Sequence, residues 1–393
     1  MRKKILGING LGRVGKLILW TKIFQKEFDE IVVNFGRDVG CSFDDVIDYI
    51  VKDSTYGRLD AYLFGAASRQ SVEVRGNEAK RFILINGVKI NILTTHRNPK
   101  EIDWRGAEII IDTTGKFNFP DRDKDHPKGS VRGHFDNPTV KKVVISSPFK
   151  LDEGDKLPKD STMVVLGING HDYKPKQHHI ISNASCTTTC LVHMFKPLLQ
   201  CYGPSALTSF AMDTIHAETG KQTVLDCVPA AGESDPCKSR SAFNNIFLTT
   251  TGAANAIKYV LPEIAEVPFI AQSIRVPTIT GSLVVLTSEM QPQNDIEPTK
   301  ENINRVYKKL ADVDTKGYLR FSSERNVSSD IIGSPAAATI IEGSQTQAVV
   351  VGEARTNSFA PQKIRVFGWY DNELGSYVNM LSDQISVVAA SIE

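Results

Sequence analysis

The first half of the chain alternates short apolar runs with polar and glycine-containing segments. The run KKILGI over 3–8 predicts a buried strand, and a glycine-rich turn leads from it into an apolar-periodic helix over 16–28. A second strand is predicted over 29–35, so the order of elements is typical of the βαβ unit of a parallel sheet. We expect an N-terminal α/β domain over 1–185, a doubly wound parallel sheet of the Rossmann type. Its further strands are predicted over 81–85, 89–95, 107–115 and 141–148.

The second half of the chain has a different pattern, in which polar and apolar residues partly alternate within each strand-like run. Such alternation is typical of a mixed or largely antiparallel sheet with one covered face. We therefore expect an α+β catalytic domain over 186–368, followed by a segment over 369–393 whose amphipathic helix packs back on the Rossmann domain. The strand-like runs lie at 205–215, 272–290, 336–341 and 363–370, and helices are predicted to begin at Cys186, near Gly252 and at Ile296.

Two segments interrupt these patterns. Between Phe117 and Thr139 the residues become polar and charged, with three prolines. We interpret this stretch as a solvated surface segment that contains an insertion. A second insertion is predicted over 349–361.

Composition narrows the class of protein. A length of 393 residues predicts two domains, and a formal net charge of +1 provides no long-range field to recruit nucleic acid or an anionic membrane. No apolar run has the length of a membrane span and no cleavable signal precedes the first strand, so we expect a cytoplasmic protein. The six cysteines form no CxxC pair and no histidine completes a zinc set, so free thiols and no metal site are expected.

The turn after the first strand carries the pattern GxGxxG, as Gly10, Gly12 and Gly15. Its place between a strand and a helix is typical of a dinucleotide-binding turn. Without a Cβ, the backbone at Gly10 and Gly12 can approach a pyrophosphate, and the positive end of the helix dipole faces that charge. A dinucleotide cofactor is therefore predicted.

The choice between NAD and NADP depends on the end of the second strand. An acidic residue that holds the ribose hydroxyls of NAD is expected about 20 residues beyond the last glycine, but Phe35, Gly36 and Arg37 stand there. A small residue followed by arginine accommodates a 2′-phosphate, which an acid would repel. We hypothesise that NADP is tolerated or preferred; in the alternative, Asn34 or Asp38 fills the ribose role.

The stretch ISNASCTTTC over 181–190 places Cys186 where a helix is predicted to begin. Ser182, Asn183 and Ser185 are cap-type residues, and a helix N-terminus stabilises a thiolate. A thiol nucleophile also needs a base. His216 follows a predicted strand and precedes a loop rich in hydroxyl groups and glycine, which favours it; the pattern leaves His178, His179 and His193 open.

Several motifs occur in the same order as in the glyceraldehyde-3-phosphate dehydrogenases. They are GINGLGRVGK, DSTYG, ISNASCTTTC, DTIHAETGKQT, TTTGAANAIKYVLPEI, IRVPT and WYDNELGSY. The sequence resembles a divergent member of the phosphorylating family over nearly its whole length. The resemblance implies that Cys186 attacks the aldehyde, that His216 serves as the base, and that inorganic phosphate attacks the resulting thioester.

The resemblance also implies binding roles and a homotetramer whose ligands are an aldose phosphate and inorganic phosphate. Asn372 matches the residue that orients the nicotinamide carboxamide. The other residues implied for the cofactor, NAD or NADP, are Asn9, Gly10, Gly12, Arg13, Val14, Thr114, Gly115 and Ser147. Gly36 and Arg37 are added to them from the pattern at the end of the second strand, where the chain departs from the family. Those implied for the attacking phosphate are Ser185, Thr187, Thr251 and Gly252, and those for the substrate phosphate are Thr219 and Arg240.

The chain departs from the family pattern at several positions. Thr189 stands where the family has asparagine, so a hydrogen bond that supports the nucleophile turn is expected to be lost or replaced. Ser376 precedes Tyr377 where the family has its tyrosine. These departures leave erythrose 4-phosphate open as the substrate. A non-catalytic relative that binds a nucleotide or RNA is the remaining alternative, against which Cys186, His216 and Arg240 together argue.

Overall fold

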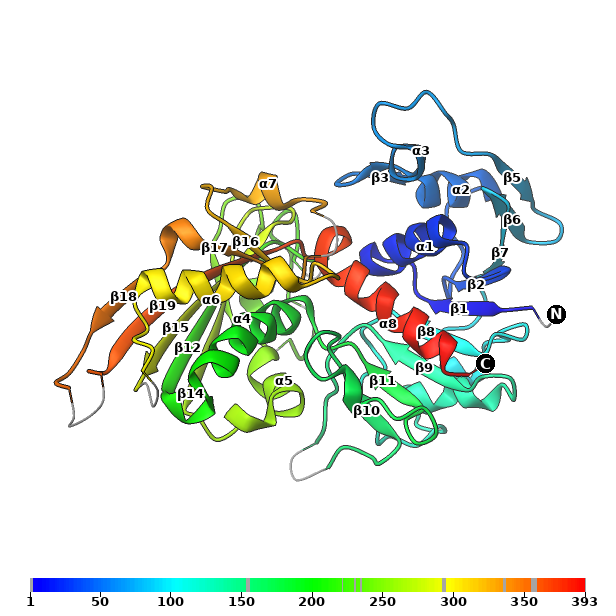
Figure 1. The fold of residues 1–393 in the computed structure, drawn as a ribbon. Helices are drawn as coiled ribbons and strands as arrows, with labels where there is room; N and C mark the ends of the chain where they lie inside the picture. The colour runs from blue at the N-terminus through cyan, green and yellow to red at the C-terminus, as the bar shows by residue number, and fades with distance from the viewer. Residues whose placement is uncertain are drawn as a thin grey trace. The chain divides into compact units, whose positions relative to one another are not determined.

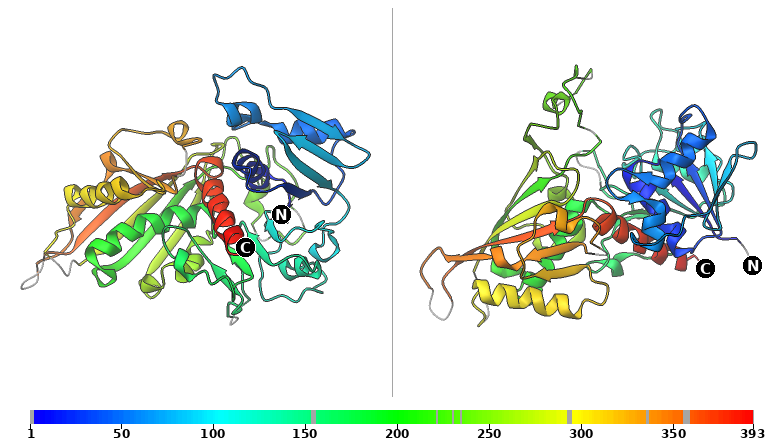
Figure 2. Two further views of the ribbon diagram at one scale, coloured as in Figure 1. Left: turned by 45° about the vertical axis from the view of Figure 1, so that its right-hand side comes forward. Right: turned by 90° about the horizontal axis from the view of Figure 1, so that it is seen from above.

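A computed structural model describes residues 3–152, 156–220, 222–229, 231–233, 235–291, 295–334, 337–354 and 359–392. The chain divides into two compact units. The first comprises residues 1–184 and 378–393, and the second comprises residues 185–377 (Figures 1 and 2). The predicted boundary at 369 falls inside strand β19 (Gln362–Tyr370), which pairs within the sheet of the second unit.

The first unit contains a nine-stranded sheet in the order β10-β11-β9-β8-β1-β2-β7-β6-β5. Seven neighbouring strands, from β10 to β7, run parallel, and β6 and β5 add an antiparallel edge. Because β1 lies between β8 and β2, the sheet has the strand order of a Rossmann-type fold, as predicted. The strands are β1 (Ile5–Asn9), β2 (Glu30–Asn34), β5 (Val74–Asn77), β6 (Phe82–Ile85), β7 (Val88–Leu93), β8 (Ile109–Asp112), β9 (Lys142–Ile145), β10 (Ser161–Met163) and β11 (Ile180–Ser182).

Helix α1 (Arg13–Gln25) begins directly after Gly12, three residues before the predicted start. Gly12 caps it in an extended conformation, and Lys26 ends it in the left-handed region at φ 54°. The last helix, α8 (Asn379–Ala390), lies beside α1 (Figure 1). Lys22 joins the two helices, because its buried Nζ donates to the Ser382 carbonyl and to the Ser386 hydroxyl, each at 3.0 Å.

The shorter elements of the first unit include one that the sequence pattern did not predict. Helix α2 (Phe43–Val51) begins with a capping box, in which Ser42 and Asp45 each bond the other's backbone N–H. The remaining elements are β3 (Lys52–Asp53), β4 (Gly57–Arg58), α3 (Leu59–Phe64) and the 3₁₀ turns η1 (Pro99–Glu101), η2 (Val131–Asp136) and η3 (Gly170–Asp172).

The segment over 117–139 corrects a prediction. It was expected to be a solvated surface segment, yet Ser130, Val131 and His134 are buried, with His134 fully inaccessible. The turn η2 carries them inward, and the Ser130 hydroxyl caps it by accepting from the Arg132 N–H at 3.1 Å. Polar composition did not reveal this because the buried side chains are themselves hydrogen-bonded.

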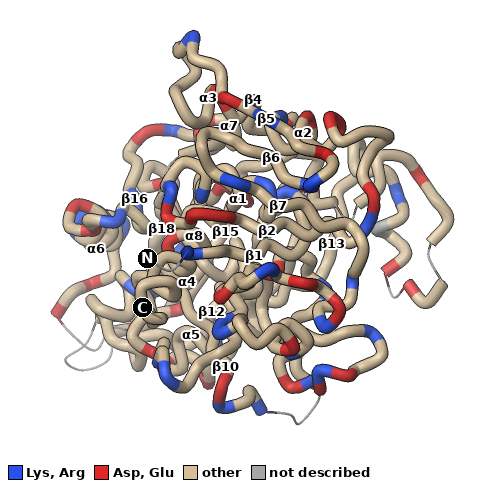
Figure 3. Tube along the Cα trace, turned by 90° about the vertical axis from the view of Figure 1, so that its right-hand side faces the viewer, with Lys and Arg blue, Asp and Glu red and all other residues tan. Residues whose placement is uncertain are grey.

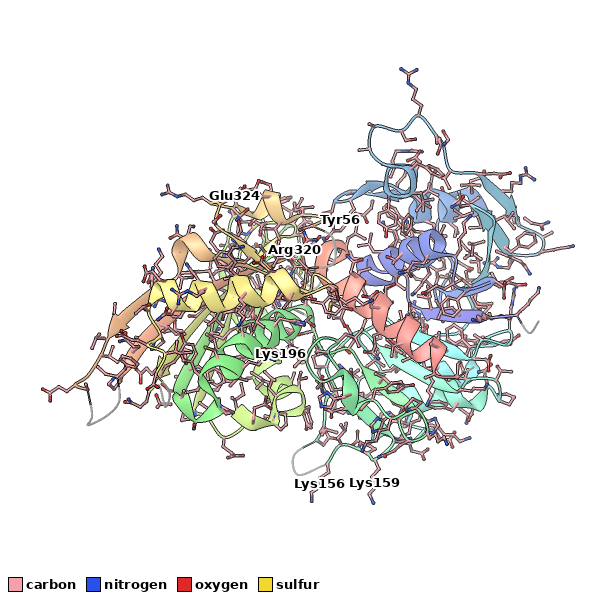
Figure 4. The ribbon with its side chains drawn as sticks, viewed as in Figure 1. Tyr56, Lys156, Lys159, Lys196, Arg320 and Glu324 are labelled. Carbon is pink, nitrogen blue, oxygen red and sulfur yellow. The ribbon has the colours of Figure 1, made fainter. Side chains whose placement is uncertain are left out.

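Strand β10 forms one edge of the sheet. It has only three residues, and two lysines precede it in the chain. Figure 4 shows Lys156 and Lys159 pointing away from the first unit. A short edge strand flanked by lysines is a poor template for pairing with another chain.

The second unit contains a mixed sheet in the order β13-β14-β12-β15-β19-β17-β16, with β18 also paired to β19. The pairs β12–β14 and β16–β17 are parallel and the others antiparallel. Burial alternates along β15 and β19, which leaves one face covered. The strands are β12 (Leu207–His216), β13 (Phe247–Thr249), β14 (Phe269–Arg275), β15 (Ser282–Met290), β16 (Leu319–Ser322), β17 (Thr339–Glu342), β18 (Gln347–Val350) and β19.

The run over 272–290, taken as one strand-like stretch in the sequence, forms two strands. A turn that ends at Gly281, at φ 83°, separates β14 from β15. The two strands lie on opposite sides of β12, one parallel and one antiparallel to it. This arrangement brings the end of β14 beside the end of β12.

Helix α4 (Cys186–Tyr202) lies against β15, β17 and β19. It begins at Cys186 as predicted, and α5 (Ala253–Val260) begins directly after Gly252. Helix α6 (Lys300–Val313) begins later than predicted, because Thr299 is its cap. The other short elements are α7 (Ser328–Ile331), the π-helical turn Leu374–Val378, and the 3₁₀ turns η4 (Pro204–Ala206), η5 (Pro236–Ser239), η6 (Pro262–Ile264) and η7 (Gly343–Gln345).

Charges of both signs are interspersed along the trace in the view of Figure 3, in keeping with the net charge of +1. Within the described residues, no helix combines the length and hydropathy that a membrane crossing requires.

Candidate active site

Cys186 is the first residue of α4, and the turn before it is tightly constrained. Ser185 caps the helix, with its hydroxyl accepting from the Thr188 N–H at 3.2 Å. Ala184 holds a left-handed backbone at φ 52°, which an L-residue adopts at a cost of roughly 1–2 kcal/mol. Cys186 as a whole residue is partly exposed at this turn. The sequence thus presents a cysteine at a helix N-terminus, where the backbone dipoles favour a thiolate.

The structure brings Cys186 and His216 together. His216 is the last residue of β12, and its Nε2 lies 3.8 Å from the Cys186 Sγ. The other histidines considered from the sequence lie elsewhere: His178 and His179 belong to the first unit, and His193 is buried in α4, with Nδ1 bonded to the Thr189 carbonyl at 2.8 Å. His216 is therefore the histidine beside the thiol.

The neighbours of His216 bear on its tautomer. Nδ1 lies 2.6 Å from the Ala217 carbonyl, which only accepts, and beside Arg275 Nη1, which only donates, so these two groups favour opposite tautomers. Nε2 faces the Cys186 thiol and, at 3.4 Å, the Asn372 Nδ2. The Asn372 Oδ1 accepts from Ser282 Oγ at 2.7 Å, which turns the amide nitrogen toward the imidazole. Nε2 is consequently an acceptor and can take the thiol proton.

Arg275 is a member of the site that the sequence reasoning missed. It ends β14 and is the register partner of His216. Its Nη1 lies against His216 Nδ1 and donates to the Ala217 carbonyl at 3.2 Å. The motif IRVPT contains this arginine, but only the pairing of β14 with β12 places it at the imidazole.

Burial and the charge of Arg275 shift the pKa values of Cys186 and His216. Burial raises the pKa of the Cys186 thiol to about 11, Glu373 adds to the increase, and Arg275 and bonds from Thr187 oppose it. Burial, with the Arg275 charge, lowers the pKa of His216 to about 3. At neutral pH the imidazole is therefore neutral and available as a base.

The predicted phosphate ligands have partners of their own. The Thr187 hydroxyl pairs with the Tyr370 hydroxyl at 2.9 Å, and Thr219 Oγ1 donates to Gln222 Oε1 at 2.7 Å. Arg240 donates through Nε to Asp226 at 3.0 Å, and its side chain is 63% exposed. Of the two arginines, Arg275 is the one at the Cys186–His216 pair. Thr251 and Gly252 immediately precede α5, so the free N–H groups of that helix follow them.

Thr189, where the family has asparagine, lies in the first turn of α4. Its side chain is 2% exposed, and its hydroxyl lacks a hydrogen-bond partner among the described residues. The expected supporting bond is therefore lost at this position.

The first unit contains a cavity of about 470 Å³ at the carboxyl ends of β1 and β2. This is where a Rossmann-type sheet binds a dinucleotide. Two further residues were predicted to bind the cofactor. Gly115 directly follows Thr114, and the carbonyl of Ser147 accepts from Ser182 Oγ at 2.7 Å. Gly12, Arg13 and Val14 form the start of α1. The cavity is lined by Asn9, Gly10, Asn34, Phe35, Gly36, Arg37, Arg97, Asn98, Thr114, Lys116, Phe117, Pro127, Lys128 and Gly129.

The glycine turn fits a pyrophosphate. Gly10 adopts φ 88°, and a Cβ at Gly15 would meet the Gly10 carbonyl oxygen at 2.2 Å. A Cβ at Gly12 would meet nothing within 4 Å, so space is open before the N-terminus of α1. The turn therefore packs closely on one side and leaves room for an anion on the other.

Four cations and no acidic residue line this cavity, all of whose lining residues are described. Arg97 Nε donates to the Gly36 carbonyl at 3.0 Å, and a Cβ at Gly36 would lie 2.9 Å from Arg97 Cγ. Asn34 uses its amide on Asn9, His96 and Gly36. Asp38 is exposed and does not line the cavity.

Comparisons with known proteins cover both units of the chain. Residues 4–120 match the family model of the glyceraldehyde 3-phosphate dehydrogenase NAD binding domain, and residues 185–372 match that of its C-terminal domain. The chain is 35% identical over 384 residues to a glyceraldehyde-3-phosphate dehydrogenase of Streptomyces coelicolor, with 96% of each chain covered. It is 32% identical over 388 residues to that of Geobacillus stearothermophilus, with 98% of each covered.

Proposed function

Because the chain belongs to the glyceraldehyde-3-phosphate dehydrogenase family, we propose that it oxidises glyceraldehyde 3-phosphate to 1,3-bisphosphoglycerate with inorganic phosphate and NAD or NADP. The observation that carries this proposal is the Cys186 Sγ at 3.8 Å from an acceptor nitrogen of His216. The overall reaction converts aldehyde, phosphate and oxidised cofactor into acyl phosphate, reduced cofactor and one proton.

The chemistry then has three steps. Cys186 attacks the aldehyde carbon as His216 Nε2 takes the thiol proton and passes it to the carbonyl oxygen, which forms a thiohemiacetal and leaves His216 neutral. His216 then accepts the hydroxyl proton while a hydride leaves the same carbon; a bound nicotinamide supplies the hydride acceptor. The resulting thioester is attacked by phosphate, and the Cys186 sulfur leaves as acyl phosphate forms.

Arg275 is our assignment for the group that holds a substrate oxyanion beside the pair. Its Nε is buried and has no hydrogen-bond partner among the described residues, so it can donate to a phosphate. Arg240 is 63% exposed and its Nε is already paired with Asp226, so we do not assign it to the oxyanion beside the pair. We propose Ser185, Thr187, Thr251 and Gly252 for the attacking phosphate, with the N-terminus of α5 contributing N–H groups. Thr219 remains proposed for the substrate phosphate and Asn372 for the nicotinamide.

We also propose that the enzyme uses NADP as well as NAD, because of the charges that line the cavity. Arg37, Arg97, Lys116 and Lys128 surround the cavity, and no acidic residue opposes a 2′-phosphate there. Because Gly36 has no Cβ, Arg97 can lie across the end of β2. We expect kcat/KM for NADP to equal or exceed that for NAD, and a strong preference for NAD would overturn this part.

A homotetramer is proposed for the assembled enzyme. Several large apolar side chains of the second unit are exposed, and such side chains mark a contact between chains when they form a patch. Val228 is 90% exposed and Phe243 71%. Sedimentation should give the mass of four chains, and the variants V228D and F243D should lower it; a monomeric wild type would contradict the proposal. The other exposed residues are Leu225, Ile246, Leu248 and Ile270.

An assay of two aldose phosphates against both cofactors tests the reaction. Glyceraldehyde 3-phosphate should be oxidised faster than erythrose 4-phosphate, and product should require phosphate or arsenate. Faster oxidation of erythrose 4-phosphate, or product formation by water alone, would replace the proposed substrate. C186S is the control, since it keeps the fold but lacks the thiol.

A further inference from the structure

A continuous chain of buried hydrogen bonds runs beneath the cofactor cavity of the first unit. It begins at Trp104, which is fully buried, and its Nε1 donates to His134 Nδ1 at 3.1 Å. His134 Nε2 contacts Asp112 Oδ2 at 3.2 Å. The Asp112 side chain stands at the carboxyl end of β8, next to β1.

The chain continues from Asp112 across the sheet. Asn9 Nδ2 donates to Asp112 Oδ2 at 2.7 Å, and Asn34 Nδ2 donates to Asn9 Oδ1 at 2.9 Å. Asn34 Oδ1 accepts from the Gly36 N–H at 3.1 Å. The chain therefore crosses from β8 through β1 to β2 and ends at the backbone on which Arg97 lies.

The chemical groups at the ends of this chain of hydrogen bonds determine which atom donates in each bond. The indole N–H of Trp104 can only donate, so His134 Nδ1 accepts and Nε2 carries the proton. A carboxylate only accepts, so Asn9 must present its amide nitrogen to Asp112 and its oxygen to Asn34. The Gly36 N–H then meets the Asn34 oxygen. A change of partner at His134 would remove one of the two side chains that hold Asp112 Oδ2, the carboxylate oxygen to which the amides are aligned.

Asp112 connects the same chain to a second lining residue. Its Oδ1 accepts from the Thr114 N–H at 3.0 Å and from the Thr114 hydroxyl at 2.6 Å. Asn9, Asn34, Gly36 and Thr114 all line the cavity. His134 and Trp104 do not, and their side-chain hydrogen bonds connect them to the cavity through Asp112.

We propose that His134 is a positioning residue for the dinucleotide cofactor, which it serves by fixing Asp112 and, through it, the Asn9 and Asn34 amides and the Gly36 backbone. This inference rests on the cofactor site proposed in the first unit. It also explains why a histidine in a polar segment is fully buried.

The test compares three variants by calorimetric titration of NAD and of NADP, which requires no catalysis. H134L leaves Trp104 and Asp112 without their partner, whereas H134Q can accept from Trp104 and donate to Asp112. H178L is the matched control: His178 is also buried in the first unit, but its Nδ1 accepts from the Lys174 N–H, far from the chain. Melting curves establish the temperature at which all variants are folded.

H134L should weaken the Kd of the cofactor about tenfold, the ratio expected for one buried group left without a partner. H134Q should restore the affinity, H178L should leave it unchanged, and KM for the aldose phosphate should stay constant in all three. If H134L fails to fold, W104F provides the second test, since it keeps an aromatic ring but removes the indole N–H bond that fixes the His134 tautomer, and weaker binding is again expected.

Unchanged cofactor affinity in H134L, or in W104F where it replaces H134L, would overturn the inference, as would equal weakening in H178L or no recovery in H134Q. A wild type that binds neither cofactor would overturn the cofactor site and this inference with it. A wild type that binds cofactor but oxidises no aldose phosphate would overturn only the proposed reaction.

Discussion

Arg275 and His216 are register partners at the ends of two parallel strands, β14 and β12. Their contact places a guanidinium against the imidazole nitrogen that faces away from the Cys186 thiol. Arg275 therefore acts on both reacting groups: its charge lowers the pKa of His216 and also lowers that of Cys186, against the effect of burial.

Replacing Arg275 should change the pH dependence of the reaction. A cation disfavours a second positive charge beside it, so R275Q should raise the pKa of His216 and move the acid limb of kcat/KM to higher pH. KM for the aldose phosphate should rise about tenfold or more, because a charged hydrogen bond to an oxyanion is lost.

Arg240 offers a matched control for that experiment. R240Q removes an exposed arginine whose partner is Asp226, so the acid limb should stay in place. An acid limb that moves in R240Q and not in R275Q would contradict the assignment of Arg275.

His216 should make the protein sensitive to acid. Burial and Arg275 lower its pKa from 6.5 to about 3, so between these values the unfolded chain binds a proton that the folded imidazole refuses. The free energy of unfolding should therefore decrease as the pH falls from 6.5 toward 3, and this contribution is fully present above pH 6.5. Urea titrations of wild type and H216Q across this range should show a smaller loss in H216Q; equal losses would show that His216 is not the group responsible.

Two glycines of the dinucleotide turn should respond differently to alanine. A Cβ at Gly12 meets no protein atom, so G12A should fold normally and bind the cofactor weakly because the methyl group occupies the pyrophosphate space. A Cβ at Gly15 would collide with the Gly10 backbone, so G15A should lower the melting temperature itself. Calorimetry and melting curves separate the two effects, and normal cofactor affinity in G12A would refute the placement of the pyrophosphate.

Removing the Thr189 hydroxyl should stabilise the protein. The group is buried without a hydrogen-bond partner among the described residues, so T189V should raise the free energy of unfolding by about 1 kcal/mol. Thr188 is the control, since it is also buried but pairs with Ser185 Oγ at 2.8 Å, and T188V should lower stability by about 1 kcal/mol. Urea denaturation measures both, and destabilisation by T189V would indicate a partner for its hydroxyl.

The sequence predicted those parts of the site that depend on local pattern. Cap-type residues located the start of α4 at Cys186, and the strand-then-loop context favoured His216. Arg275 was missed because only the pairing of β14 with β12 brings it to the imidazole. His134 was missed for a similar reason: its polar segment resembles surface, and its burial depends on partners in β8 and at Trp104. The fold followed the same division, since the βαβ pattern predicted the first sheet, whereas the turn between β14 and β15 lay within one strand-like run of the sequence.

The most direct test of the central claim is the rate of cofactor reduction with glyceraldehyde 3-phosphate in the presence and absence of inorganic phosphate, in wild type and C186S. We expect phosphate-dependent turnover in wild type, at most one reduced cofactor per active site when phosphate is absent, and no reduction in C186S. Sustained turnover without phosphate, or reduction that persists in C186S, would contradict the account.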